Sequence, residues 1–339
     1  MPFKLMLILL FFYSCQSPKN DIGNKDTSVF SIVIHGGAGT ILKKNMTKEM
    51  EIKYINKLEE AIEVGYEILK NDGSSQEAVE KTINVMEDSP LFNAGKGAVL
   101  NFDGNVELDA SFMNGSTLDA GAISGASKIK NPISAAIAVM NNSPHVMLSG
   151  TGADEFASSQ KLELKQNSYF ITERRSRSLD KVKFKENSTV IIDKEYLLTQ
   201  KYGTVGCVAL DQNGNISSGT STGGMTNKKW NRIGDAPIIG AGTYANNKTC
   251  GVSATGWGEF FIRSVVAYDI SALMEYKGLS VQEASRIVIH DKVAKLGGNG
   301  GVIALDNKGN VAMEMNTAGM YRAHMDSKGT KIIKIYADK

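Results

Sequence analysis

A threonine at position 204 opens an apolar, strand-like run, Val205 to Leu210, and directly follows a glycine at position 203. If the chain breaks between Gly203 and Thr204, a single residue carries both a hydroxyl and a new α-amino group. An α-amine has a pKa of about 8, so it can accept the hydroxyl proton near neutral pH and leave an oxygen nucleophile. Because Gly203 lacks Cβ, the main chain before this bond can adopt strained angles that favour attack on its own carbonyl. The pair predicts a self-generated nucleophile, with an ordinary strand threonine as the alternative.

Motifs rich in glycine and hydroxyl residues surround this threonine along most of the chain. They cover residues 35–40, 90–97, 108–111, 202–206, 219–227, 232–237, 240–246, 253–259 and 296–301. In this order they resemble the plant-type L-asparaginase / isoaspartyl peptidase family of N-terminal nucleophile hydrolases, which is threonine aspartase-like. The resemblance runs from about Ser31 to Met325. Each motif alone is a weak signal, whereas the ordered set is specific.

The resemblance implies five catalytic positions. Thr204 is the nucleophile that self-cleavage after Gly203 exposes, and the hydroxyl of Thr222 supports it. Thr255 and Gly256 form an oxyanion hole, in which a single hydrogen-bond donor typically contributes about 3–4 kcal/mol. Asn93 lies near the scissile bond. From the residues alone, Thr222 also fits a turn and Asn93 a loop cap.

The resemblance further implies a clamp for a small amino-acid substrate. The guanidinium of Arg232 holds the α-carboxylate and the carboxylate of Asp235 holds the α-amine, both chemically suitable pairings. A surface ion pair between these two residues is the alternative. The implied substrate-binding set is Arg232, Ile233, Gly234, Asp235, Thr255, Gly256, Trp257 and Gly258.

The implied reaction is cleavage of the side-chain amide of L-asparagine and of β-aspartyl (isoaspartyl) dipeptides. One alternative is a glycosylasparaginase acting on Asn-GlcNAc, although that branch typically carries asparagine where Gly223 stands. A second alternative, from another class, is a non-catalytic surface lipoprotein that binds amino acids.

No cofactor is expected for catalysis, but the resemblance implies a structural sodium ion. Main-chain oxygens of one loop would hold it, from Met86, Glu87, Ser89, Phe92, Ala94 and Lys96. Because carbonyl ligands do not depend on side-chain identity, only the resemblance supports this site. His35 precedes a glycine turn, and with no Ser/His/Asp order in the chain it is interpreted as structural.

Charge and cysteine content narrow the classes of partner. The formal net charge is +2, and no basic stretch indicates nucleic-acid binding. The three cysteines form neither a disulfide framework nor a CxxC pattern. Cys207 and Cys250 lie in apolar runs and are expected to be buried thiols.

The N-terminus resembles a bacterial lipoprotein signal. Residues 1–14 contain one lysine and a short apolar run, and Cys15 follows a small residue. The run is too short to span a bilayer as a mature helix. Residues 15–27 then read as a polar tether. We expect an exported protein, periplasmic or membrane-anchored through a lipid on Cys15. Phe12 departs from the usual leucine, so an ordinary cleaved signal or a misassigned start stays open.

Strand and helix patterns alternate along the rest of the chain. A strand is expected over 29–35, and helices over 48–70, 75–86, 260–276 and 281–296, two of them opened by Ser-x-x-Glu capping boxes. Asp/Gly/Asn turns at 101–105, 211–215 and 306–310 each resemble a hairpin. These patterns indicate an α+β fold of antiparallel sheets covered by helices. The resemblance implies the four-layer α-β-β-α sandwich of N-terminal nucleophile hydrolases.

A charged stretch divides this hydrolase domain. Residues 28–156 are expected to form the α-subunit part, and residues 204–339 the β-subunit part. Residues 157–203 are expected to be a mobile linker with poor helical periodicity that ends at the cleavage site. A surface insertion is the alternative for this stretch. The family implies a homodimer of cleaved αβ protomers.

Overall fold

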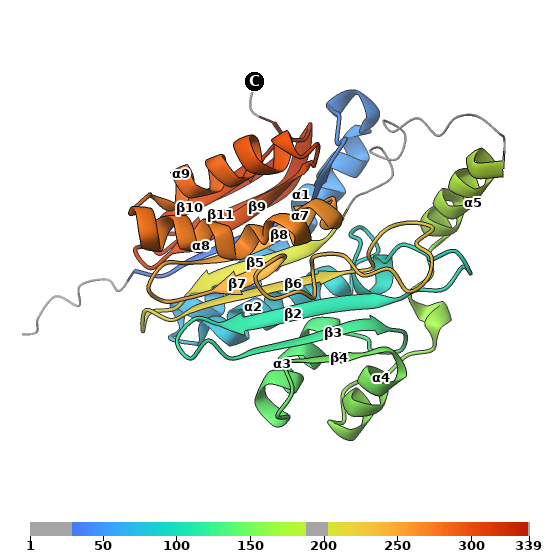
Figure 1. Cartoon of the computed structure of the whole chain (residues 1–339), viewed down its shortest axis with the longest axis horizontal. Helices are drawn as coiled ribbons and strands as arrows, with labels where there is room; N and C mark the ends of the chain where they lie inside the picture. The colour runs from blue at the N-terminus through green and yellow to red at the C-terminus, as the bar shows by residue number, and fades with distance from the viewer. Residues whose placement is uncertain (1–28, 188–202, 338–339) are drawn as a thin grey trace, which may run out of the picture.

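The computed structural model describes residues 29–187 and 203–337, which form two β-sheets with helices outside them (Figure 1). The expected signal peptide, tether and Cys15 lie outside the described residues. Within them, the larger sheet has eight strands in the order β12 (Lys331–Tyr336), β11 (Gly319–Asp326), β1 (Ser31–Gly39), β5 (Val205–Leu210), β6 (Ile216–Thr222), β2 (Leu108–Asn114), β3 (Ala120–Ala126) and β4 (Met147–Ser149). The smaller sheet has the order β10 (Val311–Met315), β9 (Gly300–Asp306), β8 (Cys250–Gly256) and β7 (Thr243–Ala245). Among these strands, only β3 and β4 pair in parallel.

The helices fall into two groups along the chain. Before the cleavage site lie α1 (Lys48–Lys70), α2 (Ser75–Glu87), α3 (Pro132–Asn142), α4 (Gly150–Ser159) and α5 (Glu173–Asn187), with short 3-10 turns η1 (Lys43–Asn45), η2 (Gly95–Gly97) and η3 (Asn167–Tyr169). After it lie α7 (Gly258–Ser264), α8 (Val266–Lys277), α9 (Val281–Arg286) and the π-helical stretch η4 (Ile287–Val293). No helix in the described ranges is long and apolar enough to cross a bilayer.

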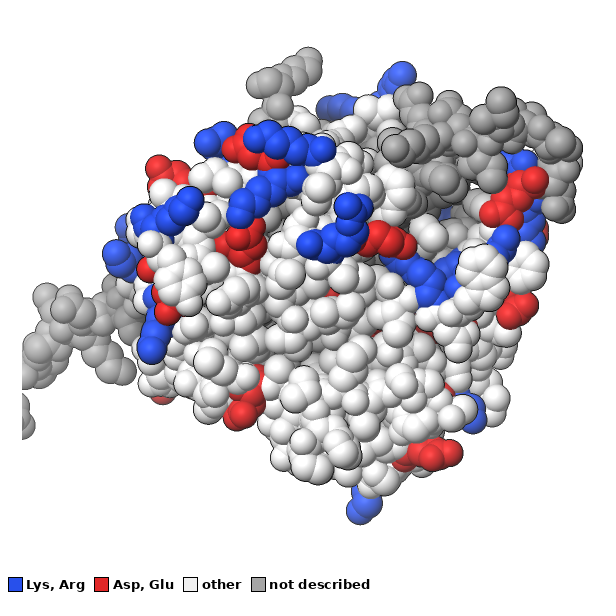
Figure 2. All heavy atoms as spheres, in the orientation of Figure 1, with Lys and Arg blue, Asp and Glu red and all other residues white. Residues whose placement is uncertain are grey.

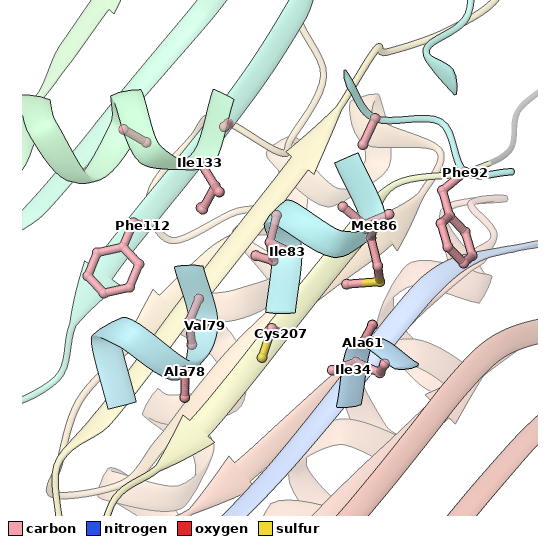
Figure 3. Packing of buried hydrophobic residues seen from close by; sticks show 14 of the residues in the cluster. Ile34, Ala61, Ala78, Val79, Ile83, Met86, Phe92, Phe112, Ile133 and Cys207 are labelled. Atoms are coloured by element: carbon pink, nitrogen blue, oxygen red, sulfur yellow. The ribbon is translucent and has the colours of Figure 1, made fainter. Parts of the chain in front are cut away.

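Three apolar clusters hold these layers together. One joins helices α1 to α3 to the outer face of the larger sheet, and Figure 3 shows Val79 and Ile83 of α2 packed between Cys207 of β5 and Ile133 of α3. A second lies between the two sheets, and a third joins the smaller sheet to α8 and α9. Mixed helix and strand content with two sheets is therefore confirmed, as is the burial of both Cys207 and Cys250.

Some of the predicted hairpins and helices are confirmed and others are wrong. The hairpins around 211–215 and 306–310 are confirmed, since they join β5 to β6 and β9 to β10. The hairpin at 101–105 is wrong, because residues 98–100 before this turn form no strand. The single helix over 260–276 is also wrong: Val265 adopts a left-handed φ of 48° and separates α7 from α8. A β-branched residue disfavours that conformation, so the residue types did not indicate a break there.

Helix α5 was not expected from its charged sequence. Its residues Leu179 and Val182 are buried, and its arginines reach distant main-chain oxygens. Arg174 donates to the Leu91 oxygen at 2.7 Å, and Arg175 donates to the Gly97 oxygen at 2.7 Å. Tertiary contacts rather than helical periodicity thus stabilise this helix. Residues 188–202 of the expected linker lie outside the described residues, and whether the stretch moves after cleavage stays a prediction.

Two glycines meet where the chain leads into β5. Gly203 has a φ of +105°, and a Cβ on it would lie 2.7 Å from the Cβ of Asn93. Gly37, at a register shift in β1, has a φ of +112°, and a Cβ there would lie 2.6 Å from the Cα of Gly203. Both positions thus require glycine for conformation and for space.

We predict that Gly203→Ala slows the self-cleavage implied by the resemblance by about tenfold or more. Alanine must hold an unfavourable φ, which costs on the order of 1–3 kcal/mol, and it also collides with Asn93. The conversion of full-length chain into two fragments on a denaturing gel measures this rate. Gly278→Ala is the matched control, since Gly278 has a φ of +64° with nothing within 4 Å of an added Cβ. Equal rates in both variants would contradict the steric explanation.

Candidate active site

The predicted nucleophile lies at the start of β5, beside the end of β6. Thr204 Oγ1 donates a hydrogen bond to Thr222 Oγ1 at 3.1 Å. Thr222 in turn donates to the main-chain oxygen of Gly203 at 3.4 Å and accepts from the Gly224 N–H at 3.0 Å. The Thr222 hydroxyl therefore contacts both the attacking oxygen and the carbonyl of the bond that would break.

Asn93 braces the main chain around this pair. Its side chain donates to the Gly224 oxygen at 2.8 Å and accepts from the Val99 N–H at 2.8 Å. Its own carbonyl accepts from the Gly223 N–H at 3.1 Å. Asn93 thus ties the loop before η2 to the turn after β6, which places it against Gly203.

The predicted oxyanion hole lies where β8 ends. Thr255 is buried, and its Oγ1 accepts from the Ala38 N–H at 3.3 Å. Within residues 29–187 and 203–337 the hydroxyl has no second partner, so its own hydrogen is available for a developing oxyanion. Gly256 and Trp257 line a pocket, and Gly203, Thr204 and Thr222 line the same pocket.

The two predicted clamp residues carry opposite charges at the other side of this pocket. Asp235 Oδ2 is buried and has no hydrogen-bond partner among the described residues. Burial raises the pKa of the Asp235 carboxyl to about 7, and the Arg232 cation opposes that shift. Gly258 makes room for both charges, because a Cβ on it would lie 2.8 Å from Asp235 Oδ1 and 3.0 Å from Arg232 Nη2. A buried carboxylate with an unused oxygen is suited to bind an ammonium group.

Sequence reasoning did not assign Glu259 a role. Arg232 donates from Nε to Glu259 Oε1 at 3.0 Å and from Nη2 to Oε2 at 2.7 Å. This two-pronged pair fixes the orientation of the guanidinium. The sequence alone does not show which residue pairs with Arg232. Met225 and Ala236 also line the pocket without having been predicted. Conversely, Ile233 is partly exposed and does not line the pocket, whereas its neighbours Arg232 and Gly234 do.

The loop expected to hold sodium is well ordered by other contacts. The carboxylate of Glu87 is buried and accepts from Ser221 Oγ at 2.6 Å and from the Ile133 N–H at 3.0 Å. Main-chain oxygens of Glu87 and Phe92 lie against two glycines, since a Cβ on Gly95 or Gly97 would come within 2.4 Å and 2.1 Å of them. In the described part of the chain no three His, Cys, Asp or Glu side chains gather to hold a metal ion. A cation in this loop would therefore depend on carbonyl oxygens.

Comparisons with known proteins agree with this arrangement. Over 310 residues the chain is 47% identical to the isoaspartyl peptidase of Escherichia coli, covering 91% of this chain and 96% of that protein. It is 40% identical over 289 residues to the isoaspartyl peptidase/L-asparaginase of Xenopus laevis, covering 85% and 90%. The family model for asparaginase matches residues 28–335. This protein therefore belongs to the asparaginase family, whose members include these peptidases.

Proposed function

We propose that this protein is a self-processing amidohydrolase that cleaves the side-chain amide of L-asparagine and the isopeptide bond of β-aspartyl dipeptides. The observation that carries the proposal is the placement of Thr204, Thr222 and the Gly203 carbonyl in the pocket that Arg232 and Asp235 line. The names of the relatives support the same chemistry.

Self-cleavage is the first step. Thr204 Oγ1 attacks the carbonyl carbon of Gly203, the C–N bond breaks as the nitrogen takes a proton, and water hydrolyses the resulting ester. Thr222 stabilises the developing oxyanion through its hydrogen bond to the Gly203 oxygen. The products are a chain ending at Gly203 and a second chain that begins with the free amine of Thr204.

Substrate hydrolysis then uses the new amine. The Thr204 amine accepts the Oγ1 proton, and the oxygen attacks the side-chain carbonyl of the bound substrate. Thr255 and the Gly256 N–H hold the oxyanion while ammonia or an amino acid leaves with a proton. Water then attacks the acyl-enzyme and releases aspartate.

The pocket favours asparagine and β-aspartyl substrates over Asn-GlcNAc. A side chain at Gly223 would lie 2.6 Å from the Cβ of Ala98 and 2.7 Å from Asn93 Oδ1. The asparagine typical of the glycan branch therefore does not fit there. Arg232 and Asp235 match the α-carboxylate and α-amine that all of these substrates present, so the preference rests on the space at Gly223.

We further propose the N-terminal nucleophile hydrolase sandwich, with residues 28–203 and 204–339 as its two subunits after cleavage and a homodimer as the assembly. The sandwich is supported by the order of the packed layers, which is helices, larger sheet, smaller sheet and helices. Figure 2 shows a wide area over β2 and β3 with few charged side chains, which supports the homodimer. Beside these strands, Leu118, Val146 and Met147 are exposed.

A sodium ion on the main-chain oxygens of Met86, Glu87, Ser89, Phe92, Ala94 and Lys96 is part of this proposal, and the glycines at 95 and 97 leave the carbonyls of Glu87 and Phe92 without a side chain against them. Its contribution would be structural. The ion would stiffen the loop that carries Asn93.

The central test is Thr204→Ala. Removal of the hydroxyl leaves no nucleophile, so we expect a chain that stays uncut and turns over neither asparagine nor β-aspartyl-leucine. A denaturing gel measures the cut and released aspartate measures turnover. Activity in this variant would refute the mechanism.

The same assay on the wild type decides between candidate functions. Turnover of β-aspartyl-leucine without turnover of Asn-GlcNAc supports the proposal. The reverse pattern supports a glycosylasparaginase, and tight aspartate binding without any hydrolysis supports an amino-acid-binding protein.

The pH dependence tests the clamp. With a pKa of about 7, Asp235 loses its charge as the pH falls, and the neutral acid no longer holds the substrate ammonium. As the pH is lowered, we expect kcat/KM for asparagine to fall in two steps. The first follows protonation of the Thr204 amine, with a pKa of about 8, and the second follows protonation of Asp235, with a pKa of about 7. Succinamate, which lacks the α-amine, should show only the first. Identical pH profiles for the two substrates would contradict the role of Asp235.

We also propose export and lipid attachment at Cys15, on the residue pattern of the N-terminus. In a bacterial host we expect radiolabelled fatty acid on the wild type and none on Cys15→Ala. Globomycin should cause only the wild-type precursor to accumulate. Equal electrophoretic behaviour of the two proteins would count against lipidation.

A further inference from the structure

A row of buried polar residues crosses the interior beside the nucleophile. On four neighbouring strands, His35 of β1 pairs with Gly206 of β5, Gly206 with Thr220 of β6, and Thr220 with Ser111 of β2. On the facing sheet, Ser253 of β8 pairs with Thr243 of β7. We call His35, Ser253, Thr220, Thr243 and Ser111 the hydroxyl row, and all five are buried.

Hydrogen bonds connect the hydroxyl row without a break. His35 Nε2 lies 3.0 Å from Ser253 Oγ, which lies 2.6 Å from Thr220 Oγ1. Thr243 donates to Thr220 Oγ1 at 2.6 Å, and Ser111 Oγ lies 2.7 Å from Thr243 Oγ1. Buried polar groups are costly unless they are paired, so a chain of four hydroxyls and one imidazole between two sheets is a specified feature rather than ordinary core packing.

Both ends of the row meet the active site. At one end, His35 Nδ1 lies 2.9 Å from the main-chain oxygen of Thr204. At the other, Ser111 Oγ lies 2.6 Å from the main-chain oxygen of Ala236, and it shares its single hydrogen between that oxygen and Thr243 Oγ1. Ala236 lines the substrate pocket and follows Asp235 directly. The row thus connects the main chain of the nucleophile to the main chain of the clamp.

The chemistry of the partners determines the proton positions at His35. A carbonyl oxygen can only accept, so the hydrogen sits on Nδ1. Burial lowers the pKa of His35 to about 3, although the bond to Thr204 opposes this, and the ring is neutral at working pH. Nε2 therefore accepts, and the Ser253 hydroxyl donates to it. One tautomer follows, and the ring does not act as an acid or base.

A glycine makes the bond between His35 and Ser253 possible. A Cβ on Gly206 would lie 2.0 Å from Ser253 Oγ and 2.3 Å from His35 Nε2. Gly206 is not among the described glycines with positive φ, so its backbone does not require glycine. The missing side chain leaves the space through which the two sheets connect.

We propose that His35 is a positioning residue for the reaction, because its Nδ1–H holds the Thr204 carbonyl, while the hydroxyl row sets the tautomer and the place of the ring. The inference rests on the proposed function. A fixed carbonyl limits rotation of the Thr204 main chain, and so sets the directions of Oγ1 and of the amine released by cleavage. Small displacements of a nucleophile cost large factors in rate.

Two substitutions distinguish the roles of the two ring nitrogens of His35. Asparagine carries its amide nitrogen near the place of Nδ1 and can still donate to the Thr204 carbonyl, whereas glutamine carries its amide nitrogen near the place of Nε2. We expect His35→Asn to keep kcat within about threefold of wild type. We expect His35→Gln to lower kcat by about tenfold or more with KM within about twofold. Rates are expressed per cleaved protomer, as counted by intact mass.

The chain offers a matched control and an independent readout. His324 also bonds a serine, Ser31 Oγ at 3.0 Å, on the same sheet, and His324→Gln should leave kcat unchanged. In ¹⁵N-histidine spectra, the signals absent from His35→Asn identify His35, and they should show a proton on Nδ1 at every pH from about 5 to 9. A proton on Nε2, or equal kcat in the Asn and Gln variants, would overturn the proposal.

Failure of the proposed function can be distinguished from failure of the proposal for His35. A fully cleaved wild type that hydrolyses neither asparagine nor β-aspartyl-leucine refutes that function. The rate of self-cleavage in His35→Asn and His35→Gln then tests the positioning of Thr204 by itself, with the Gln variant again expected to be slower.

Discussion

The site depends on the antiparallel pairing of β5 with β6. This register brings Thr204 and Thr222 together although 17 residues separate them along the chain, and it makes possible the hydrogen bond between their hydroxyls. The hairpin turn at 211–215 sets the register, and a slip of one residue in one strand would place the two side chains on opposite faces. All other parts of the site are placed relative to this hydroxyl pair.

Charge at the clamp depends on burial. Arg232 and Asp235 sit where water is largely excluded, which strengthens their attraction for a zwitterionic amino acid and raises the pKa of Asp235 to about 7. Glu259 shares the guanidinium of Arg232 and limits its orientation. The clamp therefore acts as three charges rather than two, held by a turn and by the first residues of α7.

Contacts from far along the chain brace the cleavage junction. Asn93 and Gly37 pack against Gly203, and the arginines of α5 bond the carbonyls of the loop that carries Asn93. Helix α5 precedes the cleavage site in the sequence, yet it contributes to the shape of the site. These segments all precede the cut, and Thr222 of β6, which donates to the Gly203 oxygen, is the contact from the part that follows it.

The sequence alone determined the residue types that perform the chemistry and most of the elements that carry them. These local patterns include Thr204 after Gly203, the periodicity of α1 and the turns at 211–215 and 306–310. A local pattern can be recognised from the sequence without the fold. Tertiary structure decided the rest. Helix α5, the break at Val265, the partner of Arg232 and the hydroxyl row all depend on contacts between segments distant in sequence. Those contacts stabilise conformations that local propensity does not favour, so only the folded chain reveals them.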